Sequence, residues 1–459
     1  MGFAAVLSPA VWNGFPLVFA DTGGYLERWS ERSLDIGRSA LYGAFLAAGV
    51  PLRFWPNVAV QAALTVWIVA LVLRVNGLGG RPVLLGSVMV GLSALTSLPW
   101  YVGQLMPDIF LPLAVLAIYL LALPRQALTR REIAGLIAVV GIAIALHMSI
   151  LALSLVLTLA LGLLKPVAAR LRIAAPRLAW PAASLVAGLL LAPVANLAIT
   201  GTFALTPGGT TFLFGRLVQD GIVAEYLADH CPDRTLRLCQ YRNRLPTAAD
   251  DWLWSYQSPL HRLGWWRAFE PEAGRIIRES LAEHPGRHLL AAGAGSVRQL
   301  GRFKTGEGMG SADNWHAESV LLRTAPGAVA PFRASRQQND ELDFTLINIV
   351  QVPLACLAMA ALVLFAARRW PPGARPAGWL AATCLIALFA NAAICGVFSN
   401  PNDRYQSRIV WLAPFAVMIA LLVRARAGTP ALSLRTGIGH SPDRAASASM
   451  TGEAERNRQ

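Results

Sequence analysis

The sequence predicts an all-α polytopic membrane protein, and two observations lead to this fold class. Of the 459 residues, 55% are apolar and 14% are charged, and the mean hydropathy is +0.48. A soluble protein of this length carries more charge. The apolar residues also gather into long blocks, such as residues 133–164. A helix needs about 20 apolar residues to cross a bilayer, and this chain supplies many such blocks.

About ten transmembrane helices fit this pattern. In chain order, the blocks are residues 3–20, 57–73, 82–99, 109–123, 133–147, 149–164, 178–198, 344–367, 377–397 and 409–423. The fifth and sixth blocks are short and could be tilted or partly fused. The first block lacks a positively charged leading segment and an Ala-x-Ala site, so we expect no separate cleavable signal peptide.

Basic residues in five short loops predict the orientation of the chain. The loops span residues 74–81, 124–132, 165–177, 368–375 and 424–426. Together they hold 14 arginines and lysines against one acid, Glu132. With ten spans, all five loops lie on one side, which the positive-inside rule makes cytoplasmic. Both termini are then cytoplasmic as well.

The same pattern divides the chain into four regions. Residues 1–199 hold spans one to seven and the first outer loop, and residues 344–423 hold spans eight to ten. Between them, residues 200–343 form an extracytoplasmic, mainly helical segment with 16 basic and 16 acidic residues. Residues 424–459 form a disordered cytoplasmic tail. The net charge of +14 therefore lies outside the large polar segment, and we expect no nucleic-acid partner.

The outer segment contains Cys231 and Cys239, while the other three cysteines lie in apolar blocks. A cysteine pair in an extracytoplasmic loop predicts a disulfide, and the alternative is two free thiols. No second Cys/His pair has a spacing that suits zinc. Residues 250–266 hold four tryptophans and one tyrosine, which could stack on a sugar, form a membrane-interface belt or pack in a core. We favour the belt or the core.

Two further stretches of the outer segment carry patterns. Residues 275–293 have apolar residues at helical spacing and are expected to lie on the membrane surface. Residues 304–314 are glycine-rich but lack the residue order of a phosphate-binding loop. We interpret them as a flexible loop that gates a site.

A small set of polar residues borders the apolar blocks on the outer side, and the topology places them all at one depth. They are Asp21 after the first block, Asp108 at the start of the fourth, His147 between the fifth and sixth, and Asp403, Arg404, Tyr405 and Arg408 before the tenth.

Each of these residues also has a structural interpretation. Asp108 follows a proline and could cap the helix that starts there. The arginines could anchor the chain at lipid headgroups, and His147 could be a hydrogen-bonded packing residue. Asp21 is harder to explain in this way, because ionisable groups at membrane depth are costly and usually functional. The glycines that follow it, Gly23 and Gly24, leave room for close approach.

A carboxylate beside several cations fits the transfer of a sugar from a lipid phosphate to a hydroxyl. The leaving phosphate needs cations, and the acceptor hydroxyl needs a carboxylate base. This is half of the arrangement in an inverting glycosidase. We therefore take Asp21 and Asp108 as candidate catalytic residues. The candidates for binding the donor phosphate are His147, Arg404, Tyr405 and Arg408.

Three motifs carry a resemblance to a known superfamily. They are FADTGGYL around Asp21, LMPDIFLPL around Asp108 and NDRYQSRIVWL around Tyr405. The pattern resembles the C-type (GT-C) membrane glycosyltransferases, which include dolichyl-phosphate-mannose and aminoarabinose transferases. Those enzymes carry a catalytic acid in the first outer loop, a second acid near the fourth span and, in many bacterial members, a late Arg-Tyr. The stretch 275–293 also resembles their amphipathic segment before a late span.

The sequence also departs from the superfamily. The first loop has one acid beside the membrane instead of an Asp-Glu pair. Asp108 lacks the Asp-x-Asp form seen where a metal binds, so no metal ligand is assigned, although Mg²⁺ or Mn²⁺ stays possible. The outer segment lies between spans seven and eight, whereas in many members it is C-terminal.

The resemblance implies an inverting glycosyltransferase of the cell inner membrane, active at its periplasmic face. The donor would be a polyprenyl-phosphate sugar, and the acceptor a glycan, a lipid or a protein. The alternative is a non-enzymatic membrane protein. A transporter would show charged or broken spans and internal repeats, and the chain has almost no charge in span centres. An assembly factor would show no site at all.

Overall fold

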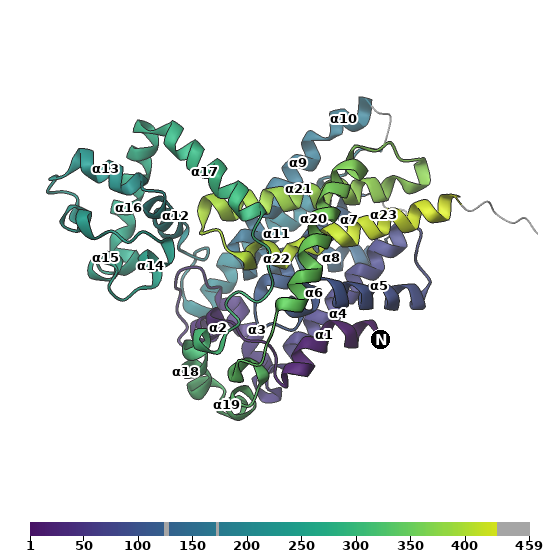
Figure 1. Ribbon diagram of the computed structural model, residues 1–459, viewed down its shortest axis with the longest axis horizontal. Coiled ribbons are helices and arrows are strands. Elements are labelled where there is room, and N and C mark those ends of the chain that lie inside the picture. The colour runs from purple at the N-terminus through teal and green to yellow at the C-terminus, as the bar shows by residue number, and fades with distance from the viewer. Residues whose placement is uncertain (124–127, 171–173, 429–459) are drawn as a thin grey trace, which may run out of the picture.

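The computed structural model describes residues 1–123, 128–170 and 174–428 (Figure 1). In these ranges the regular elements are α-helices and short 3₁₀-helices, without β-strands. Residues 424–428 belong to the last helix, α23 (Leu412–Gly428). The rest of the predicted tail lies outside the described residues.

Six helical segments of the described chain are long and apolar enough to cross a membrane, which confirms the membrane class of the protein. They are α4 (Trp55–Val75), α9 with α10 (Met148–Arg170), α11 (Ala179–Thr200), α20 (Thr345–Ala367), α21 (Arg375–Phe398) with the turn before it, and α22 with α23 (Asp403–Arg426).

Four of the predicted spans correspond to shorter helices. They are α1 (Gly2–Asn13), α5 (Pro82–Leu95), α7 (Phe110–Ala122) and α8 (Arg130–Leu146), with 12, 14, 13 and 17 residues. The number of about ten spans therefore remains a prediction. The first block, 3–20, is not one helix, because α1 ends where Gly14 adopts a left-handed conformation with φ 80°.

Helix α7 lies at the centre of the bundle. All 13 of its residues are buried, and it packs against α4, α8, α9, α11 and α21. A helix enclosed in this way satisfies its backbone internally and meets neither water nor lipid. Its N-terminal end supports part of the site described below.

The two chain ends described by the structure lie at one end of the bundle. Figure 1 shows the start of α1 and the end of α23 on the same, right-hand side of the view. At the opposite end lie α2 (Ala20–Ser30), α18 (Trp315–Thr324) and α19 (Pro326–Arg333).

Residues 209–283 form a helical lobe at the end of the bundle that carries α2 (Figure 1). Its elements are α12 (Gly209–Gln219), α13 (Ile222–His230), α14 (Ala249–Trp254), α15 (Pro259–Arg262) and α16 (Trp265–Glu283). The lobe has a hydrophobic core of its own, in which Phe214, Trp252 and Phe269 pack against one another.

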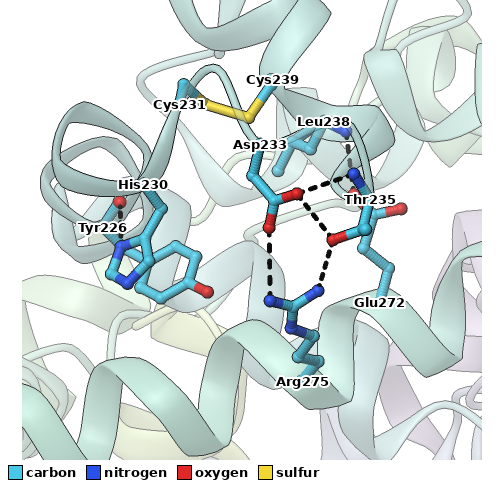
Figure 2. The surroundings of a disulfide bond; sticks show 9 residues. All are labelled: Tyr226, His230, Cys231, Asp233, Thr235, Leu238, Cys239, Glu272 and Arg275. Atoms are coloured by element: carbon cyan, nitrogen blue, oxygen red, sulfur yellow. Dashed lines mark hydrogen bonds and ion pairs between the residues drawn. A yellow bond between two sulfur atoms is a disulfide. The ribbon is translucent and has the colours of Figure 1, made fainter.

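Cys231 and Cys239 form a disulfide in this lobe, with their Cα atoms 5.6 Å apart (Figure 2). The loop that the bond closes is also held by α16. Arg275 donates to Thr235 at 2.8 Å and faces Asp233 at 3.4 Å, and the carboxylate of Glu272 accepts from the backbone N–H of Leu238 at 2.8 Å. The loop is thus fixed at several points besides its disulfide.

Helix α17 (Pro285–Leu300) leads from the lobe back to the bundle and packs along α21. Gly295 and Gly396 meet at this contact, since a Cβ on either would collide with the backbone of the other. Gln299 joins the end of α17 to the loop before α22 by two hydrogen bonds. Its side chain donates to the Asn402 carbonyl at 2.8 Å and accepts from the Asn402 N–H at 3.0 Å.

The stretch 275–293 is divided between two helices, because the chain bends at His284 between α16 and α17. The face of α17 that points away from α21 is apolar. Leu289, Leu290 and Val297 are each more than 70% exposed on this face, which suits contact with lipid.

Candidate functional site

The short helix α22 (Asp403–Val410) presents two arginines of the site. Arg404 and Arg408 are four residues apart, so they project from the same face of the helix. Helix α6 (Leu98–Val102) and the residue before it fix α22 in place. Tyr101 donates its hydroxyl to the Arg404 carbonyl at 3.3 Å, and Ser97 donates to the Ser407 carbonyl at 2.6 Å.

Asp108 lies in a 3₁₀ turn (Pro107–Ile109) that leads into α7, and its side chain is 1% exposed. One carboxylate oxygen accepts from Arg408 at 3.0 Å and lies 3.5 Å from the Arg404 Nε. The other has no hydrogen-bond partner among the described residues. Asp108 thus forms a buried ion pair, and it does not cap the helix that follows.

Asp21 lies in the first turn of α2 and not at the end of a spanning helix. Its Oδ1 accepts from Arg38 at 2.6 Å, and its Oδ2 lies 3.4 Å from Arg404. The side chain is 29% exposed, so it remains accessible from outside. Burial acts to raise the pKa of Asp21, but the two arginines outweigh burial and lower the pKa to about 2. Asp21 is therefore a carboxylate at neutral pH.

The glycines after Asp21 make room for protein and not for a ligand. A Cβ on Gly23 would lie 2.7 Å from the Cα of Ala317, where α18 packs on α2. A Cβ on Gly24 would collide with the side chain of Arg38. Gly24 therefore allows Arg38 to lie flat against α2 and reach Asp21.

Two aromatic rings lie against the guanidinium groups. The Cζ of Arg404 is 4.1 Å from the centroid of the Phe19 ring, and the Tyr405 ring lies 5.4 Å from the Cζ of Arg404 and 5.3 Å from that of Arg408. Such contacts favour the cation and restrict its position. The Tyr405 hydroxyl accepts from Ser399 at 3.4 Å, so it is the ring of Tyr405 that faces the arginines.

His147 has mainly a structural position. It separates α8 from α9 (Met148–Leu163), and its Nδ1 accepts from the backbone N–H of Ser149 at 3.2 Å, which caps α9. The Ser149 hydroxyl lies 2.8 Å from the same Nδ1 and accepts from Arg408 at 3.3 Å. His147 is thus linked to Arg408 through the hydroxyl of Ser149.

We call Asp21, Arg38, Asp108, Arg404 and Arg408 the ionic cluster. It holds three cations and two carboxylates, so it carries one excess positive charge. The Nε–H groups of all three arginines are buried and donate to no acceptor in the described chain. Buried donors of this kind are costly unless a partner accepts from them. With its excess positive charge, the cluster is suited to an anionic ligand such as a phosphate.

A second group of charges borders the cluster. The backbone N–H of Arg404 donates to Glu307 at 2.8 Å, and Arg302 lies 3.7 Å from both Glu307 and Asp403. The backbone N–H of Lys304 donates to Asp403 at 2.9 Å. The glycine-rich stretch 304–314, for which we expect a flexible loop that gates a site, is hydrogen-bonded to the start of α22 through Lys304 and Glu307.

The geometry bears on metal binding as well. Across residues 1–123, 128–170 and 174–428, no three His, Cys, Asp or Glu side chains gather as a metal ion requires. Both carboxylates of the ionic cluster face arginines. A site for Mg²⁺ or Mn²⁺ thus gains no support from this donor set.

Sequence reasoning missed Arg38 and Ser149. Arg38 is one of several basic residues in the first outer loop, and only the fold of that loop brings it to Asp21. Its one signal in the sequence is Gly24, whose role becomes clear only when Arg38 is seen against it.

Comparison with family models, curated proteins and solved structures finds no match to this chain.

Proposed function

We propose that the protein is an inverting glycosyltransferase. It would move a sugar from a polyprenyl-phosphate donor to an acceptor hydroxyl at the periplasmic face of the inner membrane, as in the GT-C superfamily. One observation carries the proposal. A single accessible carboxylate, Asp21, shares one cluster with three arginines whose donors are only partly used.

The residues of the cluster divide between two tasks. Arg38 and Arg404 bind the donor phosphate and stabilise the charge that it gains when the glycosidic bond breaks, while the buried Arg408 adds positive charge to the same cluster. Asp21 takes the proton of the acceptor hydroxyl. Asp108 is too deeply buried to touch a substrate, and it acts as a positioning residue that orients Arg404 and Arg408.

The reaction balances within these roles. The acceptor oxygen forms a bond to the anomeric carbon as its proton passes to Asp21. The bond from that carbon to the phosphate oxygen breaks, and its electron pair leaves with the polyprenyl phosphate. No general acid is needed, because the leaving group is already a stable anion.

The low pKa of Asp21 fits this sequence of events. A carboxylate with a pKa of about 2 is a weak base. When a phosphate engages Arg38 and Arg404, the positive charge available to Asp21 falls, and its pKa rises toward the ordinary value. Asp21 thus becomes a better base when the donor is in place.

The test uses membranes that contain the protein and a radiolabelled polyprenyl-phosphate sugar pool. Transfer of label should fall by about 10²–10⁴ in Asp21→Asn. Asp313→Asn is the control, because Asp313 is an exposed acid of the outer segment that takes no part in the cluster. Full transfer by Asp21→Asn would refute the catalytic role of Asp21.

A further inference from the structure

Four aromatic side chains of the lobe form a continuous row. The ring of Tyr256 lies 5.7 Å from that of His261, which stacks on Trp265 at 4.5 Å. Trp265 lies 6.5 Å from Trp254. We call these four residues the aromatic row.

The row differs from the other aromatic residues of the same stretch. Trp252 and Trp266 are buried, and Trp252 belongs to the core of the lobe. By contrast, Tyr256 is 80% exposed and Trp254 is 41% exposed. The expectation of core packing therefore holds for Trp252 and Trp266 and in part for Trp265, which packs against the lobe core, whereas Trp254 and Tyr256 are exposed.

The backbone at Trp265 supports a function for the row. Trp265 has a φ of 62°, in the left-handed region that bulky residues rarely adopt. Backbone strain of this kind clusters at functional sites. The ring of this residue is the one that stacks on His261.

The inner end of the row reaches the ionic cluster. The guanidinium of Arg38 lies over the ring of Trp254, 5.2 Å from its centroid, and the same guanidinium pairs with Asp21. The lobe is also attached to the loop between α2 and Arg38. Trp266 donates to Asp35 at 2.8 Å, and Arg267 donates to the Leu34 carbonyl at 3.0 Å. Arg38 thus links the inner end of the row to Asp21.

We propose that the aromatic row binds the acceptor as a carbohydrate chain and leads its terminal hydroxyl to Asp21. This inference rests on the proposed function and adds the class of acceptor to it. The C–H faces of pyranose rings stack on aromatic rings, and Tyr256, which is 80% exposed, offers such a ring at the outer end of the row. Exposed polar side chains beside the row, Gln257 and Arg262, can bond the sugar hydroxyls.

The first experiment measures binding without chemistry. The full-length protein in lipid nanodiscs is titrated with maltohexaose, cellohexaose, mannohexaose and chitohexaose, and tryptophan fluorescence is recorded. At least one of these oligosaccharides should bind saturably. Tyr256→Ala and Trp265→Ala should weaken that binding by about 3- to 10-fold, whereas Trp265→Phe should retain most of it.

Two control variants test whether binding depends on the row and whether it is separable from transfer. Trp315→Ala removes an exposed tryptophan of the outer side that is not in the row, and it should leave oligosaccharide binding unchanged. Asp21→Asn should abolish transfer but keep oligosaccharide binding. If the wild type transfers no sugar yet binds an oligosaccharide through the row, the proposed function fails while the binding site stands.

Three results would overturn the inference. The first is no saturable binding of any of the four oligosaccharides. The second is equal binding by the wild type, Tyr256→Ala and Trp265→Ala. The third is strong quenching of wild-type fluorescence by brominated lipids that is lost in Trp265→Phe, since the row would then face the membrane as an interface belt.

Discussion

Replacement of Asp108 by asparagine should destabilise the protein far more than the same replacement of Asp21, although the chemical change is identical. The side chains of Asp108 and Arg408 are both 1% exposed and lie 3.0 Å apart. Asp108→Asn leaves a buried, uncompensated guanidinium, which should lower the free energy of unfolding by about 3–5 kcal/mol. Asp21 is 29% exposed, and Arg404 still has Asp108 as a charged partner when residue 21 is an uncharged asparagine. Asp21→Asn should therefore cost only about 1–2 kcal/mol.

The assay compares thermal and denaturant unfolding of the purified variants in one detergent, with Asp313→Asn as the control. The expected order of stability is wild type and control first, Asp21→Asn next and Asp108→Asn last. Sugar transfer should be lost in both cluster variants. An Asp108→Asn protein as stable as the wild type, or a larger loss at Asp21 than at Asp108, would refute the assignment of Asp108 as the positioning residue.

Three further predictions concern pH, the glycine contact and topology. The pKa of Asp21 is lowered from 3.8 to about 2, so its stabilisation is complete above about pH 4 and is lost as pH falls toward 2. The difference in melting temperature between wild type and Asp21→Asn should be constant from about pH 7 to 5 and vanish near pH 2. Gly24→Ala should displace Arg38 and reduce transfer by about 10- to 100-fold in the labelled-sugar assay, with circular dichroism unchanged. A periplasm-dependent reporter fused after Gly327 should be active and one fused after Gly373 silent, and the reverse result would invert the topology.

Hydropathy alone predicts most of the long helices well. The predicted span 178–198 corresponds to α11 and the span 344–367 to α20, each within two residues. The first block fails because hydropathy cannot separate an apolar helix from an apolar segment buried in protein. Residues 15–19 form no helix, and Leu17 instead accepts from the backbone N–H of Leu105 and donates to the Gly103 carbonyl. The segment thus satisfies its polar backbone groups without a helix.

Sequence reasoning could group part of the candidate site because the predicted topology places these residues at the same depth in the membrane. Asp21, Asp108, Arg404 and Arg408 could be grouped because each borders an apolar block on the same predicted side. Arg38 could not, since its position follows from the fold of a loop. Local signals also gave Asp108 two interpretations, as a cap and as a site residue, and only the direction of its side chain separates them. The roles of all five residues remain predictions.

The pair of hydrogen bonds between Gln299 and Asn402 has a practical consequence for the design of truncated forms of this protein. Residues 200–343 resemble an insert that could be deleted or expressed alone. Yet Gln299, Lys304 and Glu307 of that insert hold the first residues of α22 by hydrogen bonds. A truncation that joins residue 199 to residue 344 would release the N-terminus of α22, and with it Arg404. Loss of activity in such a truncation would therefore not show what the deleted segment binds. Point substitutions within the segment test its binding role without displacing Arg404.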